Sequence, residues 1–527
     1  LAVYQLFLNK IVMWLLILLI VVCCFAWTYS RLTYFSLRGV KTLPPMPFLG
    51  NLTAATFGKQ NFVDAVDDGY REFKDQRYFG LYQYHVPTLI PRDPELIRQI
   101  MVRDFNAFAD RGVHIDANTD PLFGRNLIML TGKWKDMRTA LSPAFSAARC
   151  KNMAPLMDIC AINAAEYLRS KIGNGFELET NDDVIAPYVN DVIASVAFGF
   201  SVNTLKEPDN CIFRLGQKAL IQDNVQIMKF FGHENFPTLM KLLGVKILTT
   251  TVANQFSKLF KSALEARRNM SSEPRPDFIQ TLVDAAQGKL KQEVQDANNN
   301  SDTANYKKFT DDDLVSQGVL FYVAGYDTTA NLVNFCLYEI AMNPDVQERL
   351  QQELDSNPNP DDPLKLYESI QSMEYLEMVF SEVLRMWPLI GNADRRSVAR
   401  YDFGPTHEGS KINLVAEAGI HVWLPLYSLH RDPQYWDNPN KFDPERFAPG
   451  NRANIKPYTY LPFGTGPRHC IGSRFAVLTS KVLIARLLRE FSVRPSPKTP
   501  TTQRMEPKAF VLRSAHGFHL RIESRNI

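Results

Sequence analysis

The stretch PFGTGPRHCIGSRFA, Pro462–Ala476, decides the fold of this chain. It holds Cys470 among Gly464, Gly466 and Gly472, and the letters SRFAVLTSKVLIARLL that follow have a helical pattern. Glycines let the backbone approach a flat ligand closely and leave amide N–H groups free to point at a thiolate. A helix that begins just after the cysteine also stabilises a negatively charged sulfur. The stretch therefore predicts a loop that presents a cysteine thiolate to a bound group.

The alternative interpretation is a cysteine that merely fills the core, which we expect for Cys160, Cys211 and Cys336. It does not suit Cys470, because a packing residue needs neither three glycines nor an aromatic residue, Phe463, at fixed offsets. A zinc site is disfavoured, since the sequence has no C-x-x-C and no H-E-x-x-H motif. Seven cysteines scattered over 527 residues also exclude a disulfide scaffold.

A long helix is predicted upstream of this loop, from Thr310 to just before Asn343. Thr310 and Asp313 form a start that resembles a capping box. The middle of the helix carries AGYDTT, Ala324–Thr329, and is otherwise nearly uncharged, so it should be buried on most sides. A glycine there costs about 1 kcal/mol, which suggests a functional reason. The alternative is an ordinary buried helix whose hydroxyls bond back to the preceding turn.

Two further patterns place side chains on one helical face. Glu382 and Arg385 are three residues apart in SEVLRMWP, and DPERF with Arg446 follows downstream. In the first half, Trp134 and Arg138 are four residues apart. The alternatives are a bare salt bridge for the first pair and a partly buried indole beside a surface guanidinium for the second.

The order of these motifs resembles that of the cytochrome P-450 monooxygenases. Phe463-x-x-Gly466-x-Arg468-x-Cys470-x-Gly472 looks like the haem-binding loop of that family, and AGYDTT looks like its oxygen-activation helix. YSLHRDPQYWDNPNKFDPERF is similar to the animal microsomal group that includes vertebrate family 3 and insect families 6 and 9. The resemblance implies a mainly α fold with a small β portion, formed as a single large domain behind an N-terminal membrane anchor.

The resemblance also implies roles for the residues of the loop. Cys470 would be the axial thiolate ligand of the iron of haem b, in a loop shaped by Phe463, Gly464 and Gly472. His469 is a departure, because relatives often have asparagine there. The residues expected at the haem propionates are Trp134, Arg138, Arg468 and one of the adjacent Arg395 and Arg396, with Arg395 preferred.

The resemblance assigns catalysis to the long helix. Asp327 and Thr328 would deliver protons to iron-bound dioxygen through ordered water. Gly325 would open room beside the iron. The residues expected to form a buried ionic network that holds the haem loop are Glu382, Arg385 and Arg446.

The N-terminus predicts a membrane anchor. Ile11–Trp27 contains seventeen residues without a charged or polar side chain, which span about 26 Å as a helix. A cleaved signal peptide is the alternative, but the run is long and no A-x-A site follows. Arg31, Arg38 and Lys41 follow the run, which leaves the rest of the chain in the cytosol. Because the chain begins with Leu1 and not Met, its first residues are expected to be processed or incomplete.

The expected organisation is a transmembrane signal anchor over residues 1–30, a proline-rich hinge over residues 31–50 and a haem-thiolate domain over residues 51–527. The prolines of LPPMPFLGNL, Leu43–Leu52, should form a stiff spacer. The polar stretch Gln292–Lys308 should be a surface loop. Further helices are expected over 346–354 and 375–385, and strands near 80–90 and 516–522.

The charge balance bounds the partners. With 59 basic and 56 acidic residues the net charge is +3, so no nucleic-acid partner is expected. The resemblance implies NADPH–cytochrome P-450 reductase, with cytochrome b5 as a further partner, because the chain has no G-x-G-x-x-G unit of its own. Lys133, Lys135 and Lys481 are candidates for a docking face, with solvated surface charge as the alternative. The expected site is the endoplasmic reticulum membrane, with the catalytic domain on the cytosolic face.

The expected function is insertion of one oxygen atom of O2 into lipophilic small molecules, either xenobiotics or steroid-like and lipid-like compounds. The regions expected to contact substrate are 112–129 with Phe123, the surroundings of Phe230 and Phe231, Phe321 with Ala324, 389–392 and the loop near Phe510. One alternative is a haem-thiolate isomerase or dehydratase that needs no reductase, which Asp327 and Thr328 argue against. The other is a membrane-tethered haem-binding or sensing protein without turnover.

Overall fold

The structure is a computed structural model that describes residues 2–132, 134–172, 176–220, 224–269, 277–286, 309–357 and 363–525. The chain forms two compact units, each assembled from segments that are distant in sequence. Unit 1 comprises Leu1–Gly112 and Asn392–Ser428, and unit 2 comprises Val113–Gly391 and Leu429–Ile527. The chain therefore enters each unit twice, which is not the pattern of two consecutive domains. The expected domain boundaries stay a prediction.

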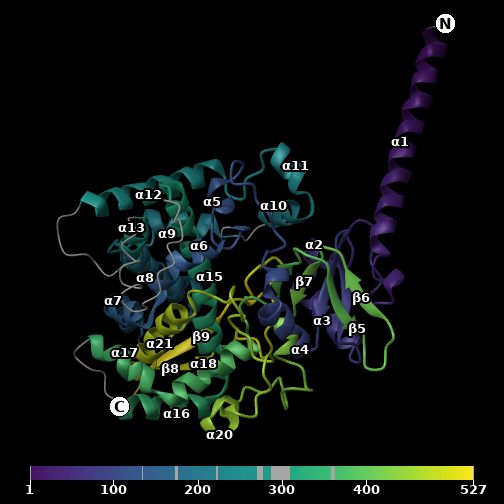
Figure 1. Cartoon of the computed structure of the whole chain (residues 1–527). Helices are drawn as coiled ribbons and strands as arrows, with labels where there is room; N and C mark the ends of the chain where they lie inside the picture. Colours follow the sequence, from purple (N-terminus) through teal and green to yellow (C-terminus); the bar gives the residue numbers. More distant parts are fainter. Residues whose placement is uncertain are drawn as a thin grey trace, which may run out of the picture. The chain divides into compact units, whose positions relative to one another are not determined.

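Unit 1 holds most of the strands (Figure 1). Its four-stranded sheet has the order β1-β2-β7-β4, and β5 pairs with β6 in a separate hairpin. β1 and β2 form an antiparallel pair from Tyr78↔Pro91 to Gln83↔Val86, which confirms the strands expected near 80–90. The elements of unit 1 are α1 (Ala2–Leu32), α2 (Thr53–Thr56), α3 (Phe62–Glu72), β1 (Tyr78–Gln83), β2 (Val86–Pro91), α4 (Pro94–Arg98), β4 (Ala393–Arg396), β5 (Tyr401–Pro405), β6 (Asn413–Ala416) and β7 (His421–Leu424).

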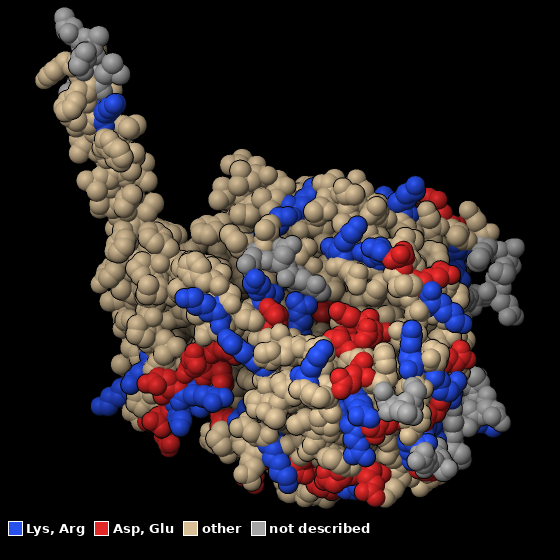
Figure 2. Space-filling view, turned by 180° about the vertical axis from the view of Figure 1, so that it is seen from behind, with Lys and Arg blue, Asp and Glu red and all other residues tan. Residues whose placement is uncertain are grey.

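Helix α1 contains the expected anchor. Among the described residues it is the one helix long and apolar enough to cross a membrane, over Asn9–Arg38, and only 6% of its most apolar window is buried. In Figure 2 the shaft of this helix is almost entirely free of charged side chains, whereas elsewhere basic and acidic side chains are intermixed. Apolar side chains exposed along a helix, such as Trp14 at 64%, are unfavourable in water and suit a lipid environment.

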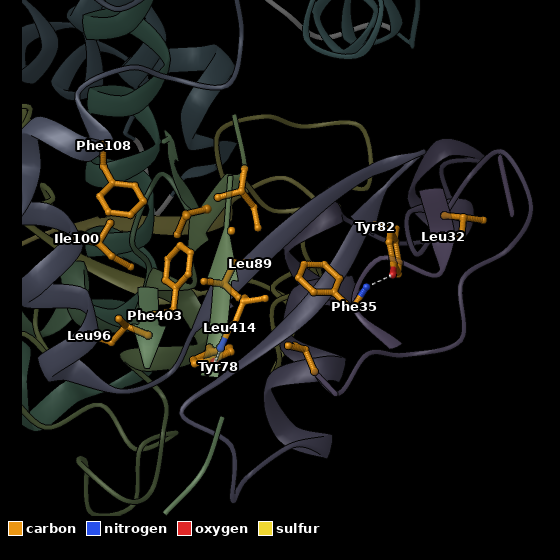
Figure 3. Packing of buried hydrophobic residues seen from close by; sticks show 14 residues of the cluster. Leu32, Phe35, Tyr78, Tyr82, Leu89, Leu96, Ile100, Phe108, Phe403 and Leu414 are labelled. Carbon is orange, nitrogen blue, oxygen red and sulfur yellow. Dashed lines mark hydrogen bonds between the residues drawn. The ribbon is translucent and has the colours of Figure 1, made fainter. Parts of the chain in front are cut away.

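The segment after α1 lies within the hinge expected over residues 31–50, which stays a prediction. Leu32, Phe35 and Val40 are buried in the apolar core of unit 1, and the backbone N–H of Phe35 donates to the Tyr82 hydroxyl at 2.9 Å (Figure 3). Further along, Gly50 pairs with Gln83 in an isolated antiparallel bridge. The first part of the hinge is therefore packed onto the sheet of unit 1.

Unit 2 is mainly helical, with one three-stranded sheet of order β3-β9-β8. The mainly α fold with a small β portion is thus confirmed. Its elements are α5 (Pro121–Gly124), α6 (Trp134–Leu141), α7 (Ala147–Lys171), β3 (Phe176–Glu179), α8 (Ala186–Phe198), α9 (Cys211–Ala219), α10 (Asn224–Asn235), α11 (Pro237–Leu242), α12 (Thr250–Asn269), α13 (Phe278–Ala286), α15 (Asp311–Met342), α16 (Pro344–Ser356), α17 (Pro363–Ser372), α18 (Glu374–Met386), α20 (Pro449–Arg452), α21 (Ser473–Glu490), β8 (Phe491–Pro495) and β9 (His519–Ser524). The short helix α19 (Leu426–Leu429) lies where the chain passes from unit 1 to unit 2.

Helix α15 is the central helix of unit 2 and confirms the long helix expected from Thr310. Thr310 caps it, since its hydroxyl accepts from the Asp313 N–H while the Asp313 carboxylate accepts from the Thr310 N–H. Helices α16, α18 and α21 and strand β9 also lie where the sequence predicts them. The loop expected over Gln292–Lys308 lies outside the described residues.

Close packing of α15 makes one glycine a test of the fold. A Cβ at Gly318 would lie 2.1 Å from Cε1 of Phe260 on α12, whose ring is fully buried. We expect Gly318→Ala to lower the free energy of unfolding by about 1–3 kcal/mol, because neither helix can yield without repacking. Gly450→Ala is the matched control, since nothing lies within 4 Å of its Cβ position. Urea unfolding of both variants measures the difference, and equal midpoints would contradict the packing described here.

Candidate active site

The site is built around Cys470, which is an exposed cysteine in the segment between Leu461 and α21. The Cys470 N–H donates to the Phe463 carbonyl at 2.9 Å, and the Gly464 N–H donates to the Leu461 carbonyl at 3.0 Å. These bonds close a compact loop. Helix α21 begins at Ser473 with no side-chain cap, so its positive end is available to a negatively charged sulfur nearby.

The glycines of this loop serve two different purposes. Gly464 and Gly466 have φ of 70° and 72°, a conformation that favours glycine. Gly472 has an ordinary φ of −92°, and its Cβ position lies 3.8 Å from Phe145, in ordinary contact. Packing within the protein therefore does not demand a bare backbone at Gly472. The space beside Gly472 and the exposure of Cys470 fit a haem held by Cys470.

Arg468 packs against helix α6 and the segment before it. Its guanidinium donates to the carbonyls of Leu127, Ile128 and Leu130 at 3.4, 3.3 and 3.0 Å. The same group lies 4.2 Å from the centroid of the Trp134 ring, in a cation–π contact. Trp134 and Arg468, which the sequence assigns to the same function, are thus brought together from residues far apart in the chain.

Arg138 completes this cluster. Its Nη1 donates to the His469 carbonyl at 2.7 Å, and its Nη2 lies 3.3 Å from Nε2 of the His469 ring. Nδ1 of the same ring lies 2.8 Å from the Gly466 carbonyl. Nδ1 therefore carries the proton and Nε2 accepts from Arg138. His469, where relatives often have asparagine, thus links α6 to the cysteine loop. The guanidinium groups of Arg138 and Arg468 both lie at this loop, where they could pair with the carboxylates of a haem.

Glu382, Arg385 and Arg446, which all precede the cysteine loop in the chain, form one ionic network. Glu382 and Arg385 are both fully buried, and two bonds of 2.6 and 2.7 Å join them. Glu382 also accepts from Arg446 Nε at 3.3 Å and from the Asp443 N–H at 3.0 Å. Because a buried charge is costly unless it is paired and hydrogen-bonded, this arrangement fixes α18 against residues 443–446.

Asp327 and Thr328 lie in the middle of α15. Asn331 Nδ2 donates to Asp327 Oδ1 at 3.0 Å, and the Thr328 hydroxyl donates to the Ala324 carbonyl at 2.6 Å. The second bond is the back-bonded arrangement that the alternative interpretation expects. Burial raises the pKa of Asp327 to about 6, partly offset by the charge of Arg513 and by the Asn331 bond. Asp327 is therefore a carboxyl whose pKa lies closer to physiological pH than that of an ordinary aspartate.

Two features of α15 were not predicted. A Cβ at Gly325 would lie 3.3 Å from Ile193 on α8, so the glycine serves close packing of two helices at that position. Asn331 bonds both the carboxylate and the carbonyl of Asp327. Its spacing of four residues from an acid in the centre of a buried helix was the signal that could have found it.

Arg395 lies in unit 1, on β4, and is described with that unit. It is 2% exposed, whereas its neighbour Arg396 is exposed, as the alternation of side chains along a strand dictates. Its Nη1 donates to the Asp394 carbonyl at 2.7 Å. Burial of Arg395 supports the preference for it over Arg396, and its contact with a propionate stays a prediction.

Two expectations are wrong. Lys481 is 2% exposed and forms an ion pair with Glu377 at 2.5 Å, so it cannot belong to an exposed docking face. Cys211 is exposed at the start of α9, although we expected it to be buried like Cys160 and Cys336. Neither error could be seen in the sequence, because both depend on which face of a helix meets a neighbour. Lys135 is exposed, and Lys133 lies outside the described residues.

A mainly helical fold with an exposed cysteine in a glycine loop and a buried Glu-Arg-Arg network fits a haem-thiolate protein. The chain belongs to the cytochrome P450 family, whose model, described as "Cytochrome P450", matches residues 40–521. It is 38% identical to "Cytochrome P450 9e2" of Blattella germanica over 93% of this chain and 94% of that protein.

Other similar proteins come from the same insect families. "Probable cytochrome P450 9f2" of Drosophila melanogaster is 34% identical over 95% of this chain and 97% of that protein. "Cytochrome P450 6k1" of Blattella germanica is 33% identical over 95% of each chain. The expected likeness to insect families 6 and 9 is confirmed. The chain is thus a P450 monooxygenase, an oxidoreductase of a family that binds haem through a cysteine thiolate. These similarities do not favour the alternative of a haem-binding protein without turnover.

The raised pKa of Asp327 makes stability depend on pH. Its folded pKa of about 6 lies above the ordinary value of 3.8, so its contribution to stability is present below pH 3.8 and is lost as the pH rises through about 6. We expect Asp327→Asn to gain about 1–3 kcal/mol in free energy of unfolding relative to wild type between pH 4 and pH 7. Urea unfolding of the holoenzyme across this range measures it. Asp345→Asn, at an exposed acid of α16, is the control, and parallel curves for wild type and Asp327→Asn would exclude the shift.

Proposed function

We propose that this chain is a membrane-anchored haem-thiolate monooxygenase in which Cys470 is the iron ligand. Electrons come from NADPH through NADPH–cytochrome P-450 reductase, with cytochrome b5 as a second donor. The substrates are lipophilic small molecules, and the site of action is the cytosolic face of the endoplasmic reticulum membrane. The observation that carries the proposal is the exposed residue Cys470, which lies in a closed loop before a helix start without a side-chain cap.

Bound haem supplies the activation of dioxygen, and the residues of this chain orient it and manage protons. Cys470 holds the iron, while the guanidinium groups of Arg138 and Arg468 offer positive charge to the propionates. Asp327 can take up and release a proton close to physiological pH, because burial raises its pKa to about 6. The Thr328 hydroxyl donates to the Ala324 carbonyl and so presents its oxygen lone pairs as acceptors. Thr328 would pass its own proton on only after its hydroxyl turns away from the Ala324 carbonyl, and a lone pair of Oγ1 would then accept the replacement proton.

Aromatic side chains support the proposal of a lipophilic substrate. Phe230 on α10 and Phe510 pack at 5.4 Å between ring centroids, which brings together two regions that the sequence assigns to substrate contact. Phe321 on α15 lies one turn before Ala324 and packs against Phe145 and Phe278 at 5.0 and 4.5 Å. Apolar rings near the cysteine loop and α15 suit a substrate that leaves water for a dry site.

Substitution of the ligand tests the proposal first. We expect the reduced, carbon monoxide-bound wild type to show the strongly red-shifted Soret band of thiolate ligation, and Cys470→His to lose it. Cys211→His is the matched control, because Cys211 is the other exposed cysteine of unit 2. A wild-type spectrum typical of a neutral ligand would overturn the assignment of Cys470. An unchanged spectrum in Cys470→His would do the same.

Substitution of Thr328 tests the proton path. We expect Thr328→Ala to form product at least about tenfold more slowly, as loss of a general acid–base group predicts, while NADPH oxidation continues and peroxide accumulates. Thr328→Ser, which keeps a hydroxyl, should recover most of the coupling of NADPH use to product. The measurement combines NADPH consumption, peroxide and product with purified reductase and a panel of lipophilic compounds. Full coupling in Thr328→Ala would exclude this role.

A further inference from the structure

His430 is a buried histidine that the mechanism does not use. It follows helix α19 and is fully buried. Its own carbonyl accepts from Arg385 Nη1 at 2.8 Å, which joins it to the Glu-Arg-Arg network. Its ring makes two more bonds, with Nδ1 at 3.2 Å from the Arg385 carbonyl and Nε2 at 2.7 Å from the Leu461 N–H. One side chain thus connects the end of α18 to the residue at which the cysteine loop begins.

The two partners fix the protonation of the ring. A backbone N–H can only donate, so Nε2 must be unprotonated toward Leu461, and a carbonyl can only accept, so Nδ1 must carry the proton toward Arg385. In a cationic ring Nε2 would also carry a proton, and its N–H would then face the Leu461 N–H, donor against donor. The charged and titratable groups around the ring are Arg385, Arg431 and the Tyr460 hydroxyl, with Glu382 beyond Arg385. Burial, with the positive charges of both arginines, lowers the pKa of His430 to about 3, so the ring is neutral under ordinary conditions.

Hydrogen bonds continue from Leu461 into the loop. The Leu461 carbonyl accepts from the Gly464 N–H at 3.0 Å, and the Phe463 carbonyl accepts from the Cys470 N–H at 2.9 Å. The preceding residue is held as well, since the Tyr460 hydroxyl donates to the Ser381 carbonyl at 3.0 Å. The entry of the loop is therefore fastened to α18 at two successive residues. At Leu461 the connection passes through the His430 ring.

We propose that His430 is a positioning residue for the haem-thiolate loop, in which its neutral ring ties the end of α18 to Leu461 and so sets the place of Cys470. This inference rests on the proposed role of Cys470. It assigns to the segment YSLHRDP a role that extends the Glu-Arg-Arg network by one uncharged link. Loss of the link should loosen the start of the loop without detaching its other end, because the Arg468–Trp134 contact and the bond of Arg138 to the His469 carbonyl remain.

The test compares two variants that each lose one donated and one accepted backbone bond. His430→Phe keeps a ring and removes both bonds to Arg385 and Leu461. Gln347→Met is the matched control, because buried Gln347 donates to the Val493 carbonyl and accepts from the Val493 N–H, both at 2.8 Å, far along the chain from the loop. Hydrogen exchange is followed by mass spectrometry on the full-length holoenzyme, and the carbon monoxide difference spectrum is recorded in mild denaturant.

We expect amide exchange over 461–470 to rise about tenfold in His430→Phe, since the partners left behind are buried and unsatisfied. Gln347→Met should instead raise exchange around residue 493 and leave 461–470 unchanged. The thiolate-type Soret band should be lost about tenfold faster in His430→Phe than in Gln347→Met at equal denaturant. His430→Gln, which keeps a donor and an acceptor, should recover part of both effects.

Two results would overturn the inference. One is equal exchange over 461–470 in His430→Phe and Gln347→Met, and the other is equal rates of band loss in the two. If His430→Phe yields no folded protein, exchange in His430→Asn decides, because the shorter amide cannot reach both the Arg385 carbonyl and the Leu461 N–H. Exchange over 461–470 that matches wild type in His430→Asn would also overturn the inference. Absence of the thiolate band in wild type is a different result, because it removes the proposed ligand and this inference with it.

Discussion

The buried carboxylate of Glu382 is the constraint on which the rest of the site depends. It has no contact with water, so every acceptor position must be met by a protein donor. Arg385 supplies two of these donors, and Arg446 and the Asp443 amide supply the others. Removing one partner would leave a charge uncompensated in the interior, which costs about 3–5 kcal/mol. The network can therefore exist only when α18 and residues 443–446 are in their final places.

This constraint reaches the cysteine loop through uncharged groups. Arg385 bonds the His430 carbonyl, and the His430 ring bonds Leu461, where the loop begins. On its far side the loop is held by Arg138, which bonds the His469 carbonyl. The cysteine between these supports remains exposed and lies just before an uncapped helix. A thiolate needs such a place, because it must be reachable by a metal and yet be surrounded by fixed donors and dipoles.

Local signals in the sequence predict much of this arrangement. The capping box of Thr310 and Asp313, the stop before Pro344 and the pair Glu382 and Arg385 each depend on residues within one or two helical turns, and each is found in the structure. What escaped prediction depends on distant partners. Burial of Lys481 needs Glu377 opposite it, and the link through His430 needs both Arg385 and Leu461. No periodicity in YSLHRDP marks that histidine as more than a turn residue.

The anchor helix α1 leads directly into the apolar core of unit 1, before the chain reaches the prolines of Leu43–Leu52. Helix α1 ends at Leu32, and Phe35 is already fully buried three residues later. Only Thr33 and Tyr34 lie between them, so a bilayer that held α1 would also restrict how unit 1 turns relative to the membrane. The prolines come after this point, where Met46 pairs with Gly50 and Gly50 with Gln83. Their stiffness therefore shapes a strap along the sheet of unit 1, whereas the junction of that sheet with α1 lies earlier, between Leu32 and Val40, and is fixed by burial of apolar side chains.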